Sequence, residues 1–459
     1  MSDLEGLAKR LFLKGFSRSL ILERLASEVT VFKDVAEQDA YAFAEAVLSE
    51  VEASLRALAN KEVGWILRHP KSGATMHDLG VGCRGEGDFF VHQLLSEIAD
   101  IGVARVLGPK AQDDAGIVGH EGRFIVVAVD GTHSRLTEFP FIAGFHVTRA
   151  AMRDVYVKGA KPVALFTDLH LADDGDIGVL FDFMGGVRAV SQLSGVPLVA
   201  GSTLRVGGDM VIGTRFVSCV GAVGVIERED MIAARRRIKP GDDVIMTEGA
   251  GGGTIATTAI YSGMPEVLLE TLNIQFIEAC EALRQSGLFS KIHAATDWTN
   301  GGLRGDCSEI CRTVKVGMKI YEEKVRSLLN KKVLSMLDTL SIDYLGVSMD
   351  ALLIFSPPEH TKEVLYTLKK VNVKCDVVGE VISDPARPIL VSNGKETCLE
   401  PLYREAAYTK IKKLVGEEAP LRKEEFMASA RRAALESLEK TKRVIELVTR
   451  KRREKAPLQ

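Results

Sequence analysis

The most constraining feature of this sequence is a series of aspartates placed beside glycines or at the ends of predicted elements. Asp130 ends an apolar run over residues 124–129, which predicts a buried strand that would hold this carboxylate rigidly. Asp113 and Asp114 fall in a predicted turn, and Asp154 falls on a predicted helix over residues 140–159. Mg²⁺ prefers a few carboxylate oxygens together with phosphate oxygens and water. Singly, each aspartate is better explained as a turn or a solvated residue; together, they indicate Mg²⁺–phosphate chemistry.

Further motifs continue the series in one order along the chain. They are Gly159-Ala160-Lys161-Pro162, Gly195-Val196-Pro197, Pro240-Gly241-Asp242-Asp243, Asp297-Trp298-Thr299-Asn300-Gly301-Gly302 and Val378-Gly379-Glu380-Val381. Each motif alone is weak, but their order over roughly three hundred residues is specific. In this order the chain resembles the aminoimidazole ribonucleotide synthetase superfamily, which includes selenophosphate synthetase, thiamine-monophosphate kinase and the hydrogenase-maturation dehydratase. It looks most like the synthetase-related proteins, including the methanogenesis-marker group.

The resemblance implies an α/β (α+β) fold of two domains with helical extensions at both ends. The sheet of the first domain would form a barrel with a second copy, so a homodimer is expected. The expected parts are a helical extension over 1–60, an ATP-binding N-terminal domain over 61–228, a C-terminal α/β domain over 229–402 and a charged helical tail over 403–459.

The resemblance also implies ATP and Mg²⁺ as cofactors and assigns roles to residues that match the motifs. The metal ligands would be Asp113, Asp114, Asp130 and Asp154. The nucleotide contacts would be Gly82, Gly85, Gly87, Asp114, Lys161 and Thr203. The catalytic residues would be Asp130 and Asp297, with Asp297 contacting the substrate or transferring a proton.

The glycine-rich stretch over residues 80–87 precedes a predicted amphipathic helix. Backbone N–H groups in such a loop, with the helix N-terminus, can bind a phosphate; a flexible entry loop is the alternative. Cys83 loosely matches a reactive cysteine of selenophosphate synthetases. Its activation would need a low pKa, which Arg84 and the helix terminus would have to provide.

The chain departs from the family pattern where a carboxylate is usual, because Ser202 occupies that position. We expect an ATP-dependent enzyme, a transferase or ligase that phosphorylates or activates a small-molecule oxygen or selenium acceptor. Serine is a poor Mg²⁺ ligand, so two alternatives stay open. One is a non-catalytic nucleotide-binding regulator, and the other is a dimeric scaffold that uses the helical extensions.

Composition argues against several other classes of protein. The formal net charge is −3, so no global basic field favours nucleic acid. Residues 421–459 hold 12 Lys and Arg against 6 Asp and Glu, which could suit RNA or an acidic partner, but an exposed helix packed along its apolar side is the favoured interpretation. Seven scattered cysteines favour a reducing compartment. With no signal-peptide pattern and no apolar run of membrane-spanning length, a cytoplasmic location without membrane contact is expected.

Overall fold

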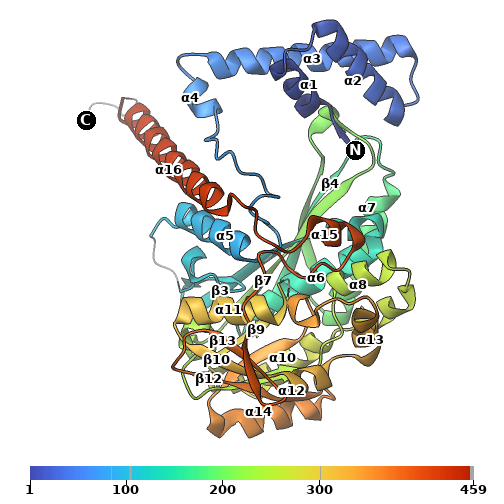
Figure 1. The fold of residues 1–459 in the computed structure, drawn as a ribbon. Helices are drawn as coiled ribbons and strands as arrows, with labels where there is room; N and C mark the ends of the chain where they lie inside the picture. Colours follow the sequence, from blue (N-terminus) through green and yellow to red (C-terminus); the bar gives the residue numbers. More distant parts are fainter. Residues whose placement is uncertain (84, 103–105, 300, 455–459) are drawn as a thin grey trace.

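Two β-sheets carry most of the molecule, and helix α6 (Pro140–Tyr156) lies between them (Figure 1). The computed structural model describes residues 1–83, 85–102, 106–299 and 301–454. The predicted α/β fold is confirmed, and so is the helix predicted over residues 140–159.

The first domain is built on an open five-stranded sheet. Its strands, in spatial order, are β2 (Gly116–His120), β3 (Arg123–Gly131), β7 (Phe216–Ile226), β4 (Lys161–Leu171) and β5 (Leu198–Arg205). Only the β4–β5 pair is parallel. Helices α6 and α7 (Gly178–Ser194) cover one face. The other face exposes apolar side chains, namely Val118, Val127, Val129, Leu204 and Val217. The barrel with a second copy stays a prediction.

The second domain holds a seven-stranded mixed sheet. Its strands, in spatial order, are β14 (Lys395–Cys398), β13 (Pro388–Ser392), β10 (Gly317–Tyr321), β12 (Cys375–Ile382), β8 (Asp243–Thr247), β11 (Leu352–Ser356) and β9 (Ala294–Asp297). Its helices are α8 (Gly253–Tyr261), α9 (Leu268–Thr271), α10 (Gln275–Gln285), α11 (Gly302–Val314), α12 (Glu322–Leu328), α13 (Lys331–Thr339) and α14 (Pro358–Lys370).

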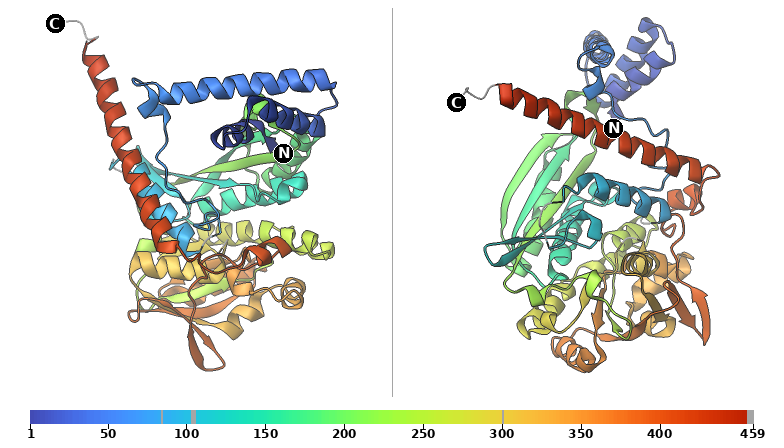
Figure 2. Two further views of the ribbon diagram at one scale, coloured as in Figure 1. Left: turned by 45° about the horizontal axis from the view of Figure 1, so that its top comes forward. Right: turned by 90° about the vertical axis from the view of Figure 1, so that its left-hand side faces the viewer.

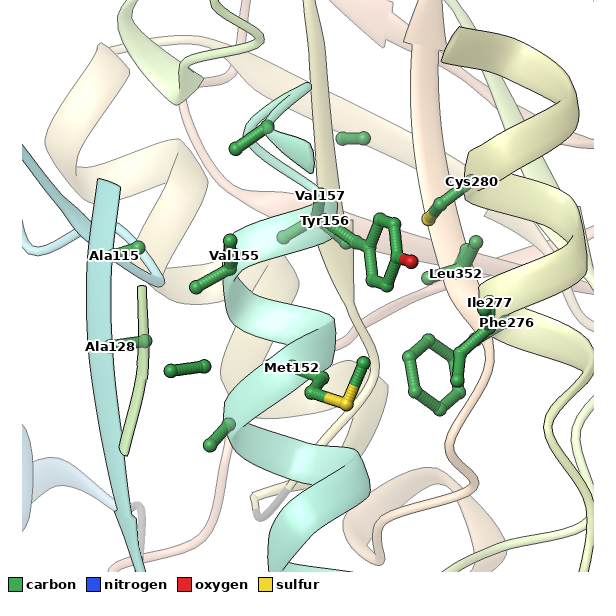
Figure 3. Packing of buried hydrophobic residues seen from close by; sticks show 14 of the residues in the cluster. Ala115, Ala128, Met152, Val155, Tyr156, Val157, Phe276, Ile277, Cys280 and Leu352 are labelled. Atoms are coloured by element: carbon green, nitrogen blue, oxygen red, sulfur yellow. The ribbon is translucent and has the colours of Figure 1, made fainter. Parts of the chain in front are cut away.

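One hydrophobic cluster joins the two domains through α6. On one side of the helix, Val155 faces Ala128 of the first sheet; on the other, Met152 and Tyr156 face α10 (Figure 3). Tyr156 and Phe276 meet edge to face with ring centroids 6.5 Å apart. Such burial stabilises both neighbours of α6 together, so the polar residues of this helix are held at the domain junction.

The first three helices form a separate small core. They are α1 (Leu4–Leu13), α2 (Arg18–Phe32) and α3 (Glu37–Ala59). Short strand β1 (Ser2–Asp3) pairs with β6 (Val211–Ile212), and Lys33 binds Asp173 and Asp174 at 2.5 and 2.6 Å. These contacts fix the three helices to the part of the first domain that holds β6. The short helix α4 (Gly64–Leu67) follows α3 along the chain.

The C-terminal part returns to the first domain. After β14 the chain passes through a buried irregular stretch and α15 (Lys410–Val415) to the long helix α16 (Lys423–Glu454). Helix α16 packs at its start on α5 (Glu86–Ala99), where Lys423 binds Glu86 at 2.6 Å, and its far end projects from the body (Figure 2). None of the helices in the described ranges is long and apolar enough to cross a bilayer.

Candidate functional site

A cleft of about 550 Å³ opens where the two domains meet, and acidic side chains dominate its charge. Residues of α5, of the β3–α6 connection and of α6 form the first-domain side, while the start of α8 and the end of β9 form the second-domain side. Two arginines line it, against seven carboxylates: Asp113, Asp114, Asp130, Asp154, Asp297, Glu309 and Asp350. The wall therefore has a formal excess of five negative charges, which favours a cationic or cation-bound ligand.

Helix α6 carries cations that reach across the domain junction. Arg149 and Arg153 are four residues apart and therefore share one face of the helix. Arg153 binds both Asp297 and Asp350, and Arg149 binds Asp350 at 2.9 Å. Burial would raise the pKa of Asp350, but these two guanidinium groups outweigh it and lower the pKa to about 2. Asp350 is therefore a charge-compensated carboxylate.

Asp113 and Asp114 are compensated in the same way. Lys158, which is fully buried just after α6, binds both carboxylates, the one of Asp114 at 2.9 Å. Arg235, 3% exposed in the linker between the domains, binds Asp114 at 2.6 Å and Glu309 at 2.6 Å. Burial opposes ionisation of Asp114, yet the charges of Arg235 and Lys158 prevail and lower its pKa. These aspartates already have cationic partners within the protein.

Asp154 stands in a different electrostatic environment. It is a partly exposed residue of α6 that lines the cleft together with Asp130 at the end of β3. Burial, followed by the nearby carboxylates of Asp130, Asp297 and Asp114, raises the pKa of Asp154 well above its ordinary value. A carboxyl group whose ionised form is disfavoured in this way suits a bound cation, because the positive charge would favour the ionised form.

Asp297 ends β9 at the floor of the cleft and is 2% exposed. Burial raises the pKa of Asp297, the Arg153 guanidinium lowers it, and the Asp114 carboxylate raises it again; the net shift is upward. A raised pKa is what an aspartate needs to exchange a proton near neutral pH. The predicted role in substrate contact or proton transfer is therefore chemically reasonable here.

The cleft unites five of the predicted site residues, namely Asp113, Asp114, Asp130, Asp154 and Asp297. Others lie elsewhere. Lys161 is exposed at the start of β4, and Thr203 is exposed on the edge strand β5 beside Ser202; none of the three lines the cleft.

The predicted glycine contacts also lie off the cleft. Gly85 and Gly87 are packed against residues 402–403: a Cβ on Gly85 would stand 2.1 Å from the carbonyl oxygen of Tyr403. Gly82 has φ +84° and donates its N–H to Asp88 at 3.0 Å. The glycines are thus explained by tight packing and a left-handed turn.

Cys83 does not meet the requirement for an activated thiol. Burial raises its pKa, and the charge of Lys412 only partly opposes this. Arg84, which was expected to lower that pKa, lies outside the described residues, as does Asn300 of the second-domain motif.

Sequence reasoning missed six residues of the charge network, namely Arg149, Arg153, Lys158, Arg235, Glu309 and Asp350. For Arg149 and Arg153 a signal existed, because a spacing of four on an apolar helix places both on one face. Lys158 is three residues before the predicted Lys161 and could have been chosen instead, since it follows directly on the helix. Arg235 belongs to a run of three arginines that reads as a solvated linker, so it gave no signal.

Two family models match most of the chain between residues 112 and 390. The model of the AIR synthase related protein N-terminal domain matches residues 112–226, and that of the C-terminal domain matches residues 239–390. The uncharacterized protein MJ1416 of Methanocaldococcus jannaschii is 49% identical over 457 residues, which is 99% of this chain and 100% of that protein. Phosphoribosylformylglycinamidine synthase subunit PurL of Thermoplasma acidophilum is 26% identical over 300 residues, covering 60% of this chain and 37% of that subunit.

Solved structures share the fold. The HypE–HypF complex matches with a TM-score of 0.55 at 20% identity, over 67% of this chain and 99% of that one. PurL of T. maritima complexed with ATP matches with a TM-score of 0.52 at 19% identity, over 80% of this chain and 55% of that one. The predicted two-domain fold and superfamily are confirmed. The chain belongs to the AIR synthase related protein family.

Proposed function

We propose that this protein is a Mg²⁺-dependent enzyme that uses ATP to phosphorylate or activate a small-molecule acceptor. The observation that carries the proposal is the domain-junction cleft with seven carboxylates and two arginines in its wall. A nucleotide alone would be repelled by such a wall, whereas Mg²⁺ would screen its phosphates from these carboxylates.

The family supports ATP as the ligand. Members of the AIR synthase related family bind ATP and act as kinases or synthetases, and one solved relative is PurL complexed with ATP. Other similar proteins are named selenide, water dikinase, an activity that includes phosphoryl transfer. The chain spans only 37% of the first listed PurL subunit, so the activity of the whole PurL protein is not transferred.

The ion pairs and pKa shifts in the cleft indicate which carboxylates could bind a metal. Asp113 and Asp114 are compensated by Lys158 and Arg235, whereas burial, followed by like charges that include Asp130, raises the pKa of Asp154. Among the described residues, no group of three or more His, Cys, Asp or Glu side chains is arranged to hold a metal by itself. Mg²⁺ bound with a nucleotide needs only one or two protein carboxylates, since phosphates and water complete its shell. We assign this role to Asp130 and Asp154, where the ion would neutralise phosphate charge.

The remaining groups of the cleft would act on the acceptor and on the protein itself. Asp297, with its raised pKa, would contact the acceptor and accept or return its proton. Arg153 bonds to Asp297 from α6 and would hold its carboxylate in place. Lys158 and Arg235 would hold Asp113 and Asp114 in place through their ion pairs rather than contact the nucleotide directly.

Calorimetry of Mg–ATP binding tests the proposal, with wild type beside Asp154→Asn. The control is Asp209→Asn, because the Asp209 side chain is 67% exposed and pairs with Arg205 on the surface of the first domain. We expect binding by wild type and control, and at least tenfold weaker binding by Asp154→Asn, the loss of a charge-assisted contact of about 1.5–3 kcal/mol.

Product analysis of the same samples separates ADP from AMP formation. Slow nucleotide cleavage that needs Mg²⁺ would support an enzyme and justify a search for the acceptor. Failure of wild type to bind ATP with Mg²⁺ would contradict the proposal, and equal binding by Asp154→Asn would contradict the metal assignment.

We further propose a homodimer formed through the open face of the first sheet, where Val127, Val129 and Val217 are exposed. Exposed apolar side chains on one face of a sheet commonly mark an interface. Light scattering during size-exclusion chromatography measures the mass: a monomer at micromolar concentration would contradict this part of the proposal, and Val129→Glu is expected to separate a dimer.

A further inference from the structure

A short stretch near the C-terminal end, here called the strap and comprising residues 402–409, lies outside both matched family domains. Residues 403–406, 408 and 409 are buried, and Ala406 and Tyr408 belong to the hydrophobic cluster of the second domain. Tyr403, Glu405 and Tyr408 are 6%, 7% and 3% exposed. An irregular segment with so little exposure must satisfy its polar groups within the protein, and those partners identify what the strap holds.

One end of the strap fixes the stretch that leads into α5. The Tyr403 hydroxyl donates to the carbonyl of Asp78 at 2.8 Å, and Nη2 of Arg404 donates to the carbonyl of His77 at 2.7 Å. The backbone N–H of Glu405 donates to the carbonyl of Cys83 at 2.9 Å. Because α5 supplies one wall of the cleft, the strap fixes where that wall begins.

The other end of the strap reaches a chain of hydrogen bonds whose directions can be assigned. The Thr257 hydroxyl lies 2.8 Å from the carbonyl of Gly253, which can only accept, so Thr257 donates there. Its oxygen is then left to accept from Nδ1–H of His133 at 3.2 Å. The neutral ring therefore carries its proton on Nδ1, and Nε2 accepts from the Tyr408 hydroxyl at 2.8 Å.

This chain connects parts of the cleft that are distant in sequence. His133 belongs to the β3–α6 connection of the first domain, and Gly253 begins α8 of the second; both line the cleft. Both ring nitrogens of His133 are already bonded within the protein, so this histidine is not available as a general acid or base. Its contribution is positional.

We propose that Tyr408 is a positioning residue of the nucleotide cleft: through His133 and Thr257 it fixes the start of α8 against the first domain, while the rest of the strap fixes the start of α5. The inference rests on the proposed function only for the ligand, Mg–ATP; the bonding itself is a property of the protein. Preorganised walls raise affinity because less ordering remains to be done on binding.

Tyr408→Phe in the full chain removes only the hydroxyl, and Tyr366→Phe is the matched control, because Tyr366 is 69% exposed on α14. Three quantities are measured. Nitrogen NMR of protein labelled with ¹⁵N-histidine gives the tautomer of His133, whose signals are assigned with His133→Gln. Hydrogen–deuterium exchange reports on residues 77–83, 85–88 and 253–257. Calorimetry gives the dissociation constant of Mg–ATP.

We expect wild-type His133 to be protonated on Nδ1, and Tyr408→Phe to lose this signature as Nε2 loses its donor. Hydrogen–deuterium exchange in the named segments should accelerate. Mg–ATP should bind about tenfold more weakly, because Nε2 of His133 becomes a buried acceptor without a donor. Tyr366→Phe should match wild type in all three.

Two results would overturn the inference. One is a wild-type His133 protonated on Nε2, which is decisive even if Tyr408→Phe does not fold. The other is a folded Tyr408→Phe with unchanged exchange and unchanged Mg–ATP affinity. If wild type binds no Mg–ATP, the proposed function fails, and the tautomer and exchange measurements still decide whether Tyr408 positions the two walls.

Discussion

Replacement of Arg235 by methionine tests whether the buried ion network holds the two domains together. Arg235 is 3% exposed and donates to Asp114 at 2.6 Å, to Glu309 at 2.6 Å and to the backbone carbonyl of Gln112 at 2.9 Å. Methionine keeps much of the side-chain volume but leaves these acceptors without the guanidinium. Glu309 comes from α11 of the second domain and Asp114 from the first, so the loss falls on the junction.

The magnitude follows from which charges lose compensation. Breaking a buried ion pair by removing one partner costs about 3–5 kcal/mol. Lys158 still compensates Asp113 and Asp114 in the variant, so we take the lower end, about 3 kcal/mol. With a slope of about 3 kcal/mol per molar urea, the unfolding midpoint should fall by about 1 M. Arg235→Lys should recover only part, because a compact ammonium cannot bond to both carboxylates as the guanidinium fork does.

Urea unfolding followed by circular dichroism and tryptophan fluorescence measures this loss. The control is Arg236→Met: Arg236 is exposed and donates to the carbonyl of Val106 at 2.9 Å, so a change below about 0.5 kcal/mol is expected. In the double variant with Glu309→Leu, the two losses should be less than additive by about 1–3 kcal/mol. Equal midpoints for Arg235→Met and Arg236→Met would refute the reasoning.

Two further predictions concern single buried groups. Burial lowers the pKa of His146 to about 3, so below pH 6.5 the unfolded chain binds a proton that the folded chain does not, and stability falls as the pH falls from about 6.5 towards 3. Between pH 7.5 and 5, the free energy of unfolding of His146→Gln should therefore drop by about 2 kcal/mol less than that of wild type. Equal drops in the two proteins would contradict the lowered pKa. Burial raises the pKa of the Cys83 thiol, whereas Cys398 is exposed, so iodoacetamide at neutral pH should label Cys398 first. Mass spectrometry of digests taken at successive times gives the order of labelling. Faster labelling of Cys83 would show an activated thiol.

The sequence predicted the elements and the carboxylates better than it predicted the cations. The apolar run before Asp130 and the helical period around Asp154 are local patterns, and the family motifs bring both to the cleft with Asp297. Arg235 lies 121 residues from Asp114 along the chain, and nothing local in its arginine run records that pairing.

The glycines between residues 80 and 87 show a second limit of sequence reasoning. Their composition is typical of a phosphate loop, and the prediction followed that composition. The nearest neighbour of Gly85 is Tyr403, more than three hundred positions away, whose backbone carbonyl lies where a Cβ of Gly85 would be. Close packing and phosphate binding both select glycine, so composition alone cannot separate them.

The raised pKa of Asp154 has a consequence for stability. Burial, followed by like charges, raises the pKa of Asp154, so its ionised form opposes folding in the absence of a cation. Asp154→Asn removes that cost while keeping shape, and should raise the free energy of unfolding by on the order of 1 kcal/mol at neutral pH without Mg²⁺, even as it weakens Mg–ATP binding. Asp114→Asn should lower the free energy of unfolding, because it removes the partner of two buried cations, Lys158 and Arg235. Urea unfolding of both variants without metal measures the signs, and a destabilised Asp154→Asn would mean that this carboxylate supports the fold rather than the ligand.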